Sequence, residues 1–175
     1  MRKIEMRRHA LKGTGTTKEM LSSEGIAQAK RIGAEQMKGK GYTDVATSFY
    51  FRTAQTAAAF AEGAGDFAAT NHATLDALFT KRLDELVAYH KEHGSVVKPE
   101  HPLIKEESAR MAREFTAWLD TLPADAHVLA VGHSPLVEML VYGLTSQVLE
   151  PLKECEGCAI DSHDGHLMLT EHFRF

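Results

Sequence analysis

Four residues whose side chains can bind or attack a phosphoryl group lie far apart in this sequence. Arg8 and His9 follow a short apolar run in "IEMRRHALKG" (residues 4–13), and Arg52 and His133 come later in the chain. A guanidinium group presents a planar set of donors that matches phosphate oxygens. A histidine ring nitrogen can act as a nucleophile. These residues predict a phosphate site that contains a nucleophile; the alternative interpretation is a set of surface ion pairs.

The length and charge of the chain restrict what it can bind. Its 175 residues suit one domain, which we place over 1–175. The net charge of −4 gives no overall attraction for nucleic acid, so an anion must be held by a local basic cluster. The sequence has no apolar run long enough to span a membrane and no secretory signal. We therefore expect a cytoplasmic protein that binds neither nucleic acid nor membrane.

Hydrophobic periodicity predicts strands alternating with helices. Strands are expected at 2–6, 44–48 and 127–132. Ser22 or Ser23 is expected to cap a first helix, and Ser134-Pro135 to be the N-cap and first position of another. Further helices are expected at 52–62, at 105–122 and in a segment that stops at Gly94; "SVVKPEHP" is expected to be a loop. The end of the chain is predicted to be a hairpin that turns at Asp164-Gly165.

This alternation indicates an α/β fold with a largely parallel sheet. Ligands of such sheets bind at the carboxyl ends of the strands. Arg8-His9, Ser48 and Gly132-His133 all follow predicted strands, so we expect them to converge in space. Arg7 is expected to point away from Arg8, because neighbouring side chains of a strand face opposite sides.

Taken in order, the motifs resemble those of the histidine phosphatase superfamily, whose fold is phosphoglycerate-mutase-like. They are Arg8-His9-Ala10, the helix entry Leu21-Ser22-Ser23-Glu24-Gly25-Ile26-Ala27-Gln28-Ala29, then Ser48, Arg52 and Gln55-Thr56-Ala57, and finally Gly132-His133-Ser134. The resemblance runs from residue 4 to about 145. It implies a three-layer α/β/α architecture with a mostly parallel central sheet.

The resemblance also implies an activity: a metal-independent phosphatase that needs no cofactor. His9 would be the nucleophile and form a phosphohistidine, which water then hydrolyses. Arg8, Arg52 and Ser134 would bind the phosphoryl group, and protonated His133 would donate to a non-bridging oxygen. The substrate would be a phosphorylated small molecule or a phosphoprotein. The short chain most resembles the phosphohistidine-phosphatase branch, and a phosphomonoester or phosphohistidine substrate both remain open.

A leaving alkoxide needs a proton, and many members of this family place a carboxylic acid over the pocket. Asp76 is our candidate for this acid, with Asp84 and Glu85 as competitors. The phosphohistidine-phosphatase branch works without such an acid, because an imidazole departs more easily.

Two departures from the family pattern affect the functional prediction. Ala10 replaces the usual glycine, which would be costly only if this position has a positive φ. Residues 12–17, "KGTGTT", lack the Ser and Asn of the mutases, although Lys12, Thr14 or Thr16 could contact substrate. The alternative function is therefore a phosphate-binding or protein-interaction module of the same fold that is weakly active or inactive, with Ala10 as the lesion.

Cys155 and Cys158, followed by His163 and His166, also invite a zinc or redox interpretation. A zinc finger has about a dozen residues between its Cys and His pairs, and here four separate Cys158 from His163. The hairpin explains the spacing better.

Overall fold

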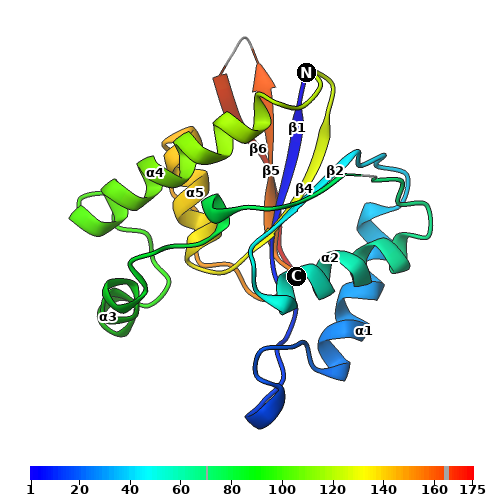
Figure 1. The fold of residues 1–175 in the computed structure, drawn as a ribbon, viewed down its shortest axis with the longest axis horizontal. Helices are drawn as coiled ribbons and strands as arrows, with labels where there is room; N and C mark the ends of the chain where they lie inside the picture. The colour runs from blue at the N-terminus through cyan, green and yellow to red at the C-terminus, as the bar shows by residue number, and fades with distance from the viewer. Residues whose placement is uncertain (70, 164–165) are drawn as a thin grey trace.

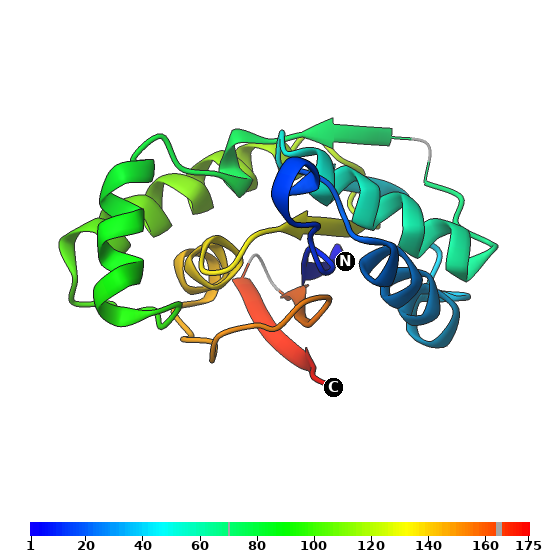
Figure 2. The same cartoon turned by 90° about the horizontal axis from the view of Figure 1, so that it is seen from below.

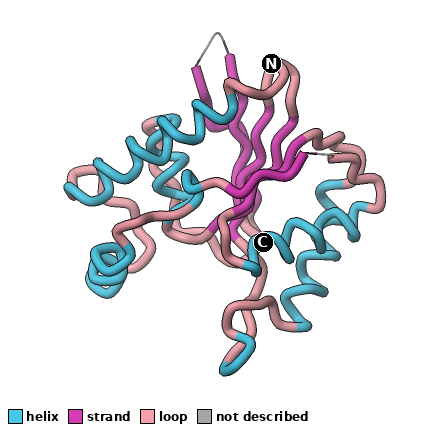
Figure 3. The backbone as a smooth tube through the Cα atoms, in the orientation of Figure 1, coloured by secondary structure: helices cyan, strands magenta, loops and turns pink. Residues whose placement is uncertain are grey.

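A six-stranded sheet forms the centre of the protein (Figures 1 and 3). The structure, a computed structural model, describes residues 1–69, 71–163 and 166–175. The strands are β1 (Lys3–Arg8), β2 (Asp44–Thr47), β3 (Asn71–Thr74), β4 (His127–Gly132), β5 (Gly157–His163) and β6 (His166–Phe173). Their order in the sheet is β3-β2-β4-β1-β5-β6, and the first four are parallel to one another. The strands β5 and β6 are antiparallel and extend the sheet beyond β1.

Helices cover both faces of this sheet (Figure 2). They are α1 (Ser23–Ile32), α2 (Phe51–Ala64), α3 (Leu83–His93), α4 (Pro102–Leu119) and α5 (Leu136–Thr145), with short 3-10 turns at Gly15–Thr17 and Asp76–Leu78 and a π-helical turn at Gly33–Met37. One apolar core lies between the sheet and α3, α4 and α5. A second lies between the sheet and α1 and α2. The predicted α/β/α layering and mostly parallel sheet are therefore confirmed.

Several local predictions are confirmed by the structure. The strand at 127–132 has the predicted bounds, and every residue after His127 in it is buried. Ser22 caps α1, since its Oγ accepts from the Gly25 N–H at 3.0 Å. Gly94 follows α3 with a φ of 65°, a conformation that glycine adopts without a steric penalty. The C-terminal hairpin is present, and its predicted turn at Asp164-Gly165 lies outside the described residues.

Several predicted boundaries are wrong, and three of them have a clear physical reason. Helix α4 begins at Pro102 because proline fits the first helical position, so this residue is not part of a loop. The first strand was predicted over 2–6 and extends to Arg8. Arg7 belongs to the strand because its side chain is buried as an ion pair with Glu5. Ser134 does not cap α5. Pro135 precedes the helix, and the Ser134 hydroxyl donates to the Glu138 carboxyl group instead of accepting from a backbone N–H.

The parallel pairing of β1 with β4 brings the two key histidines together. Arg8 lies opposite Gly132 in the register, so the next residues, His9 and His133, leave the sheet side by side. The His9 N–H donates to the Gly132 carbonyl at 3.0 Å and continues the ladder by one bond. The fold therefore creates the predicted convergence at the carboxyl ends of the strands.

None of the described helices is long and apolar enough to cross a membrane.

Candidate active site

A cavity of 240 Å³ lies at the carboxyl ends of β1 and β4. Its lining residues come from both ends of the chain and from the segments between the strands: Arg8, His9, Lys12, Tyr50, Arg52, Phe79, Leu83, Leu86, His133, Ser134, Leu136 and Glu154. All five predicted residues of the phosphate site, namely Arg8, His9, Arg52, His133 and Ser134, are among them.

His9 is held with one ring nitrogen fixed and the other facing Arg52. Its Nδ1 lies 2.7 Å from the Ala10 carbonyl, which can only accept, so Nδ1 carries the proton. The lone pair is then on Nε2, which accepts from Arg52 Nε at 3.3 Å. Burial lowers the pKa of His9 to about 4, with Arg52 and Arg8 adding to this effect. The ring is therefore neutral near pH 7, and the lone pair of Nε2 is directed toward Arg52.

Arg52 connects the two histidines from the first turn of α2. Its Nε donates to His9, its Nη2 lies 3.4 Å from His133 Nδ1, and its Nη1 pairs with Glu19 at 3.3 Å. The guanidinium also lies over the Tyr50 ring, 4.4 Å from the centroid. A cation at the N-terminus of a helix reinforces the attraction of that terminus for anions. Arg52 thus places several donors where a phosphoryl group bound to His9 would lie.

His133 is neutral in the free protein. Burial, together with the neighbouring His9, Arg52 and Arg8, lowers its pKa to about 2. Because Arg52 can only donate, His133 Nδ1 accepts, and Nε2 carries the proton toward Ser48 Oγ at 2.7 Å. The His9 and His133 rings lie edge to face, with centroids 5.1 Å apart. The protonated His133 expected from the sequence therefore requires an added negative charge in the pocket.

Arg8 is positioned by the loop that precedes β5. Its Nη1 donates to the Leu152 carbonyl at 2.6 Å, and its Nη2 pairs with Glu154 at 2.7 Å. Its Nε is buried without a partner, so this donor of the guanidinium remains unused. Among the described residues that line the cavity, only Glu154 has a carboxyl group. A single loop therefore orients Arg8 and places a negative charge beside it.

Glu138 is a buried carboxyl group on α5 that connects this loop to Ser134. Its Oε1 accepts from the Ser134 hydroxyl and, at 2.8 Å, from the Leu152 N–H. Its Oε2 is buried without a partner. Burial raises its pKa to about 7, although these two hydrogen bonds and the charge of Arg8 oppose the rise. Ser134, predicted to bind substrate, is thus engaged with Glu138 at the edge of the cavity.

Glu138→Gln should change the pH dependence of stability. The folded-state pKa of about 7 exceeds the ordinary value of 4.5, so the stability from the bound proton is complete below pH 4.5 and is lost as the pH rises through 7. A glutamine has no such proton. The free energy of unfolding of Glu138→Gln minus that of wild type should therefore increase by about 3 kcal/mol between pH 5 and pH 8. Urea denaturation at each pH measures this difference. The exposed control Glu35→Gln should show no such change, and equal pH profiles for wild type and Glu138→Gln would contradict this role.

The structure does not place the predicted general acid in the cavity. Asp76 begins a 3-10 turn whose next two residues, Ala77 and Leu78, are buried, so its carboxyl group points outward. Its side chain is 69% exposed and pairs with Lys81 at 3.7 Å. The competitors Asp84 and Glu85 are exposed in the first turn of α3, and Glu85 pairs with Arg82.

Ala10 fits its position without backbone strain. Among the described non-glycine residues, only Ser146 and Cys155 have a positive φ. Ala10 is fully buried, and its N–H donates to Thr56 Oγ1 at 3.0 Å. The steric cost of a positive φ therefore does not arise at Ala10. This removes the main argument for an inactive pocket.

Arg7 faces away from Arg8, as predicted, but it is buried and not a surface residue. It pairs with Glu5 at 2.6 Å and donates to the Cys155 carbonyl at 3.1 Å. The side chain of Phe173 covers it, with the ring centroid 4.0 Å from the guanidinium carbon. The loop that carries Glu154 is therefore held by Arg7, which contacts it from the other face of the sheet.

The cysteines are free thiols that pack in different cores. Cys155 belongs to the core under α1 and α2, and Cys158 to the core under α4 and α5. Burial raises the pKa of each thiol to about 12. Within the described part of the chain, no group of three His, Cys, Asp or Glu side chains could hold a metal. This packing does not support the zinc and redox interpretations.

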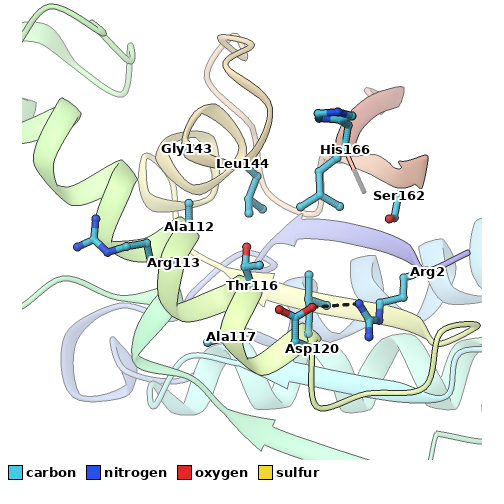
Figure 4. Close-up of a pocket in the computed structure, with 12 residues that line it drawn as sticks. Arg2, Ala112, Arg113, Thr116, Ala117, Asp120, Gly143, Leu144, Ser162 and His166 are labelled. Carbon is cyan, nitrogen blue, oxygen red and sulfur yellow. Dashed lines mark hydrogen bonds and ion pairs between the residues drawn. The ribbon is translucent and has the colours of Figure 1, made fainter. Parts of the chain in front are cut away.

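A larger cavity, of 640 Å³, lies at the opposite end of β1, between α4, α5 and the hairpin (Figure 4). Arg2, which lines it together with Arg113, pairs with Asp120 at 3.3 Å and also donates to the Leu122 and Pro123 carbonyls. The guanidinium is thus already satisfied. The residues predicted to bind phosphate line the smaller cavity instead.

The comparison with protein-family models finds one that matches residues 6–160, and it is described as the histidine phosphatase superfamily, branch 1. The chain belongs to the histidine phosphatase superfamily. This membership confirms the resemblance inferred from the four motifs and the predicted enzyme class, a phosphatase-type hydrolase. A search of the curated proteins finds no match to the sequence.

Solved structures of other proteins share the fold of this histidine phosphatase. A phosphoserine phosphatase from Entamoeba histolytica, in complex with 3-phosphoglyceric acid, is 19% identical with a TM-score of 0.70, covering 100% of this chain and 98% of that one. A phosphoglycerate mutase from Bacillus anthracis is 16% identical with a TM-score of 0.68, covering 97% and 91%. A mycobacterial glucosyl-3-phosphoglycerate phosphatase is 16% identical with a TM-score of 0.70, covering 97% of each chain.

Sequence reasoning missed several residues of this histidine phosphatase pocket. Glu154 reaches it from a loop whose position depends on β5 pairing with β1, and no motif in the sequence marks that pairing. Glu138 lies four residues after Ser134, a helical spacing that was readable but had no expected role. Tyr50 and Phe79 had no predicted role, and their contact with the pocket depends on the path of the chain after β2 and β3.

Proposed function

We propose that this chain is a metal-independent phosphatase that works through a phosphohistidine at His9. The carrying observation is the arrangement of His9 itself: Nδ1 is fixed by the Ala10 carbonyl, and the neutral Nε2 faces Arg52 and His133. In the first step Nε2 attacks phosphorus, and the bond to the leaving group breaks with its electron pair on that group. In the second, water attacks phosphorus, the N–P bond breaks, and inorganic phosphate leaves.

The surrounding groups suit the charge of this reaction. Phosphoryl transfer spreads negative charge over three equatorial oxygens, so the protein contributes mainly positioning and electrostatic stabilisation. Arg52 and Arg8 supply the positive charge that stabilises these oxygens, and Ser134 lies at the edge of the site. A bound dianion would also favour protonation of His133, whose Nδ1 already lies on the side of Arg52 and could then donate to a non-bridging oxygen.

The substrate of this reaction is a phosphomonoester or a phosphohistidine. The phosphoserine phosphatase and the glucosyl-3-phosphoglycerate phosphatase that share the fold carry phosphorylated small molecules in their names. This supports a phosphorylated substrate here without choosing among them.

The purified protein should hydrolyse para-nitrophenyl phosphate, with the same rate in excess EDTA as in added Mg²⁺. The reason is that the guanidinium groups occupy the role of a metal ion. Loss of activity in EDTA with recovery in Mg²⁺ would contradict metal independence. Binding of phosphate or vanadate without any hydrolysis would instead support the inactive module. Parallel assays with phosphohistidine protein and sugar phosphates separate the two substrate classes.

A further inference from the structure

The cavity has two chemically different sides. Arg8, His9, Arg52 and His133 form the phosphate side. The other side is apolar and consists of Tyr50, Phe79, Leu83, Leu86 and Leu136, and three further polar residues, Lys12, Ser134 and Glu154, complete the lining. A phosphorylated sugar or amino acid offers hydroxyl, amino or carboxyl groups beside the phosphate, and the apolar side provides no hydrogen-bonding partner for them apart from the Tyr50 hydroxyl.

Three rings form a continuous surface from His133 to the solvent, which we call the aromatic wall: Phe49, Tyr50 and Phe79. The Tyr50 ring lies edge to face with His133, with centroids 5.2 Å apart. Phe79 contacts Tyr50 at 5.3 Å and Phe49 at 4.5 Å. Phe49 is 54% exposed. Exposed apolar surface that continues into a polar pocket indicates a binding surface, here for the part of the substrate next to phosphorus.

The supply of protons to the leaving group points the same way. Glu154, the carboxyl group on the described lining, accepts a hydrogen bond from Arg8 and forms an ion pair with it. Asp76 lies outside the cavity and pairs with Lys81. His133 is uncharged in the free protein because burial lowers its pKa, and in the proposed reaction its protonated form donates to a non-bridging oxygen and not to the leaving group. An alkoxide leaves poorly without a proton donor, whereas a phenolate spreads its charge over a ring and leaves without one.

Resting on the proposed function, we infer that the preferred substrates are phosphate esters of aromatic alcohols, with the ring against the aromatic wall. Phosphorus is transferred to His9 Nε2, and the P–O bond breaks with its electron pair on the phenolic oxygen. The phenolate leaves and takes a proton from water, and hydrolysis of the phosphohistidine releases inorganic phosphate. Stacking and edge-to-face contacts with Tyr50 and Phe79 hold the ring.

The test compares kcat/KM for 1-naphthyl phosphate and glycerol 3-phosphate, because this ratio reports the step in which the leaving group departs. Wild type should favour the naphthyl ester by at least about 100-fold. Phe79→Ala should reduce that preference about ten-fold, chiefly through a higher KM for the naphthyl ester. Phe79→Leu, which keeps an apolar side chain, should lose less. The control Phe175→Ala, an exposed ring that does not line the cavity, should leave the preference unchanged.

A second series uses phenyl phosphates with substituents of increasing electron withdrawal. Without a proton donor, log kcat/KM should fall steeply as the pKa of the leaving phenol rises; a flat series would overturn the inference. So would equal kcat/KM for the naphthyl and glycerol esters, a preference unaffected in both folded Phe79 variants, or a higher kcat/KM for phosphohistidine protein than for every aryl ester. If no phosphate compound is hydrolysed, the proposed function itself fails. A phosphotyrosine peptide compared with free aryl esters shows whether the phenol is carried by a polypeptide or a small molecule.

Discussion

His9→Ala is expected to lower kcat/KM for aryl phosphates by at least about 1,000-fold, because it removes the atom that accepts the phosphoryl group. The loss should appear in kcat, since the guanidinium groups of Arg8 and Arg52 still bind the phosphate. Stopped assays with 1-naphthyl phosphate measure it. Circular dichroism should show an intact fold, because the side chain lies at the cavity and not within either core.

The matched control for this variant is His90→Ala, which removes an exposed imidazole from α3. It should retain wild-type kcat and KM. Retention of wild-type turnover by His9→Ala would show that another group, or a directly activated water, attacks phosphorus.

Arg52→Ala is expected to lower kcat/KM by about 100- to 1,000-fold, the effect of removing a donor aimed at developing negative charge. Arg52 contacts both histidines, so no other described side chain replaces it in this geometry. Arg52→Lys keeps the charge but loses the planar fork, and should recover only part of the activity. The exposed Arg113→Ala on α4 is the control, and an Arg52→Ala variant with wild-type kcat/KM would contradict the phosphate-binding role.

The same variant should shift the pH profile. Burial is the main cause of the low pKa of His9, and the charge of Arg52 contributes to it. Removing this cation should raise the pKa of His9 from about 4, so that the neutral nucleophile is lost at a higher pH. The acid limb of kcat/KM should therefore move to higher pH in Arg52→Ala relative to wild type. A shift to lower pH would mean that another group controls this limb.

The convergence of Arg8, His9 and His133 was predictable from the sequence because it depends only on which residues follow parallel strands. Buried strands have a clear hydrophobic signal, as at 127–132, and parallel strands end at one edge of the sheet. Arg52 was equally accessible, since it lies in the first turn of the helix that follows β2.

The predictions failed where a side chain's partner comes from elsewhere in the chain. Asp76 has a suitable sequence position, but the burial of Ala77 and Leu78 turns its carboxyl group outward. Ser134 has the residue type of an N-cap, and the buried Glu138 carboxyl group competes for its hydroxyl. The backbone conformation of Ala10 depends on contacts such as its hydrogen bond to Thr56. The sequence alone therefore could not show whether φ at this position is positive.

The most direct test of this account is to trap the phosphoenzyme. Wild type, mixed with a phosphorus-labelled aryl phosphate and quenched in alkali, should carry label that survives alkali and is released by acid, as phosphohistidine does. Peptide mass spectrometry should place it on His9, and the label should be absent from His9→Ala and present in His90→Ala. Label on another residue, or rapid turnover with no label on the protein at any quench time, would contradict the proposal that His9 is the nucleophile.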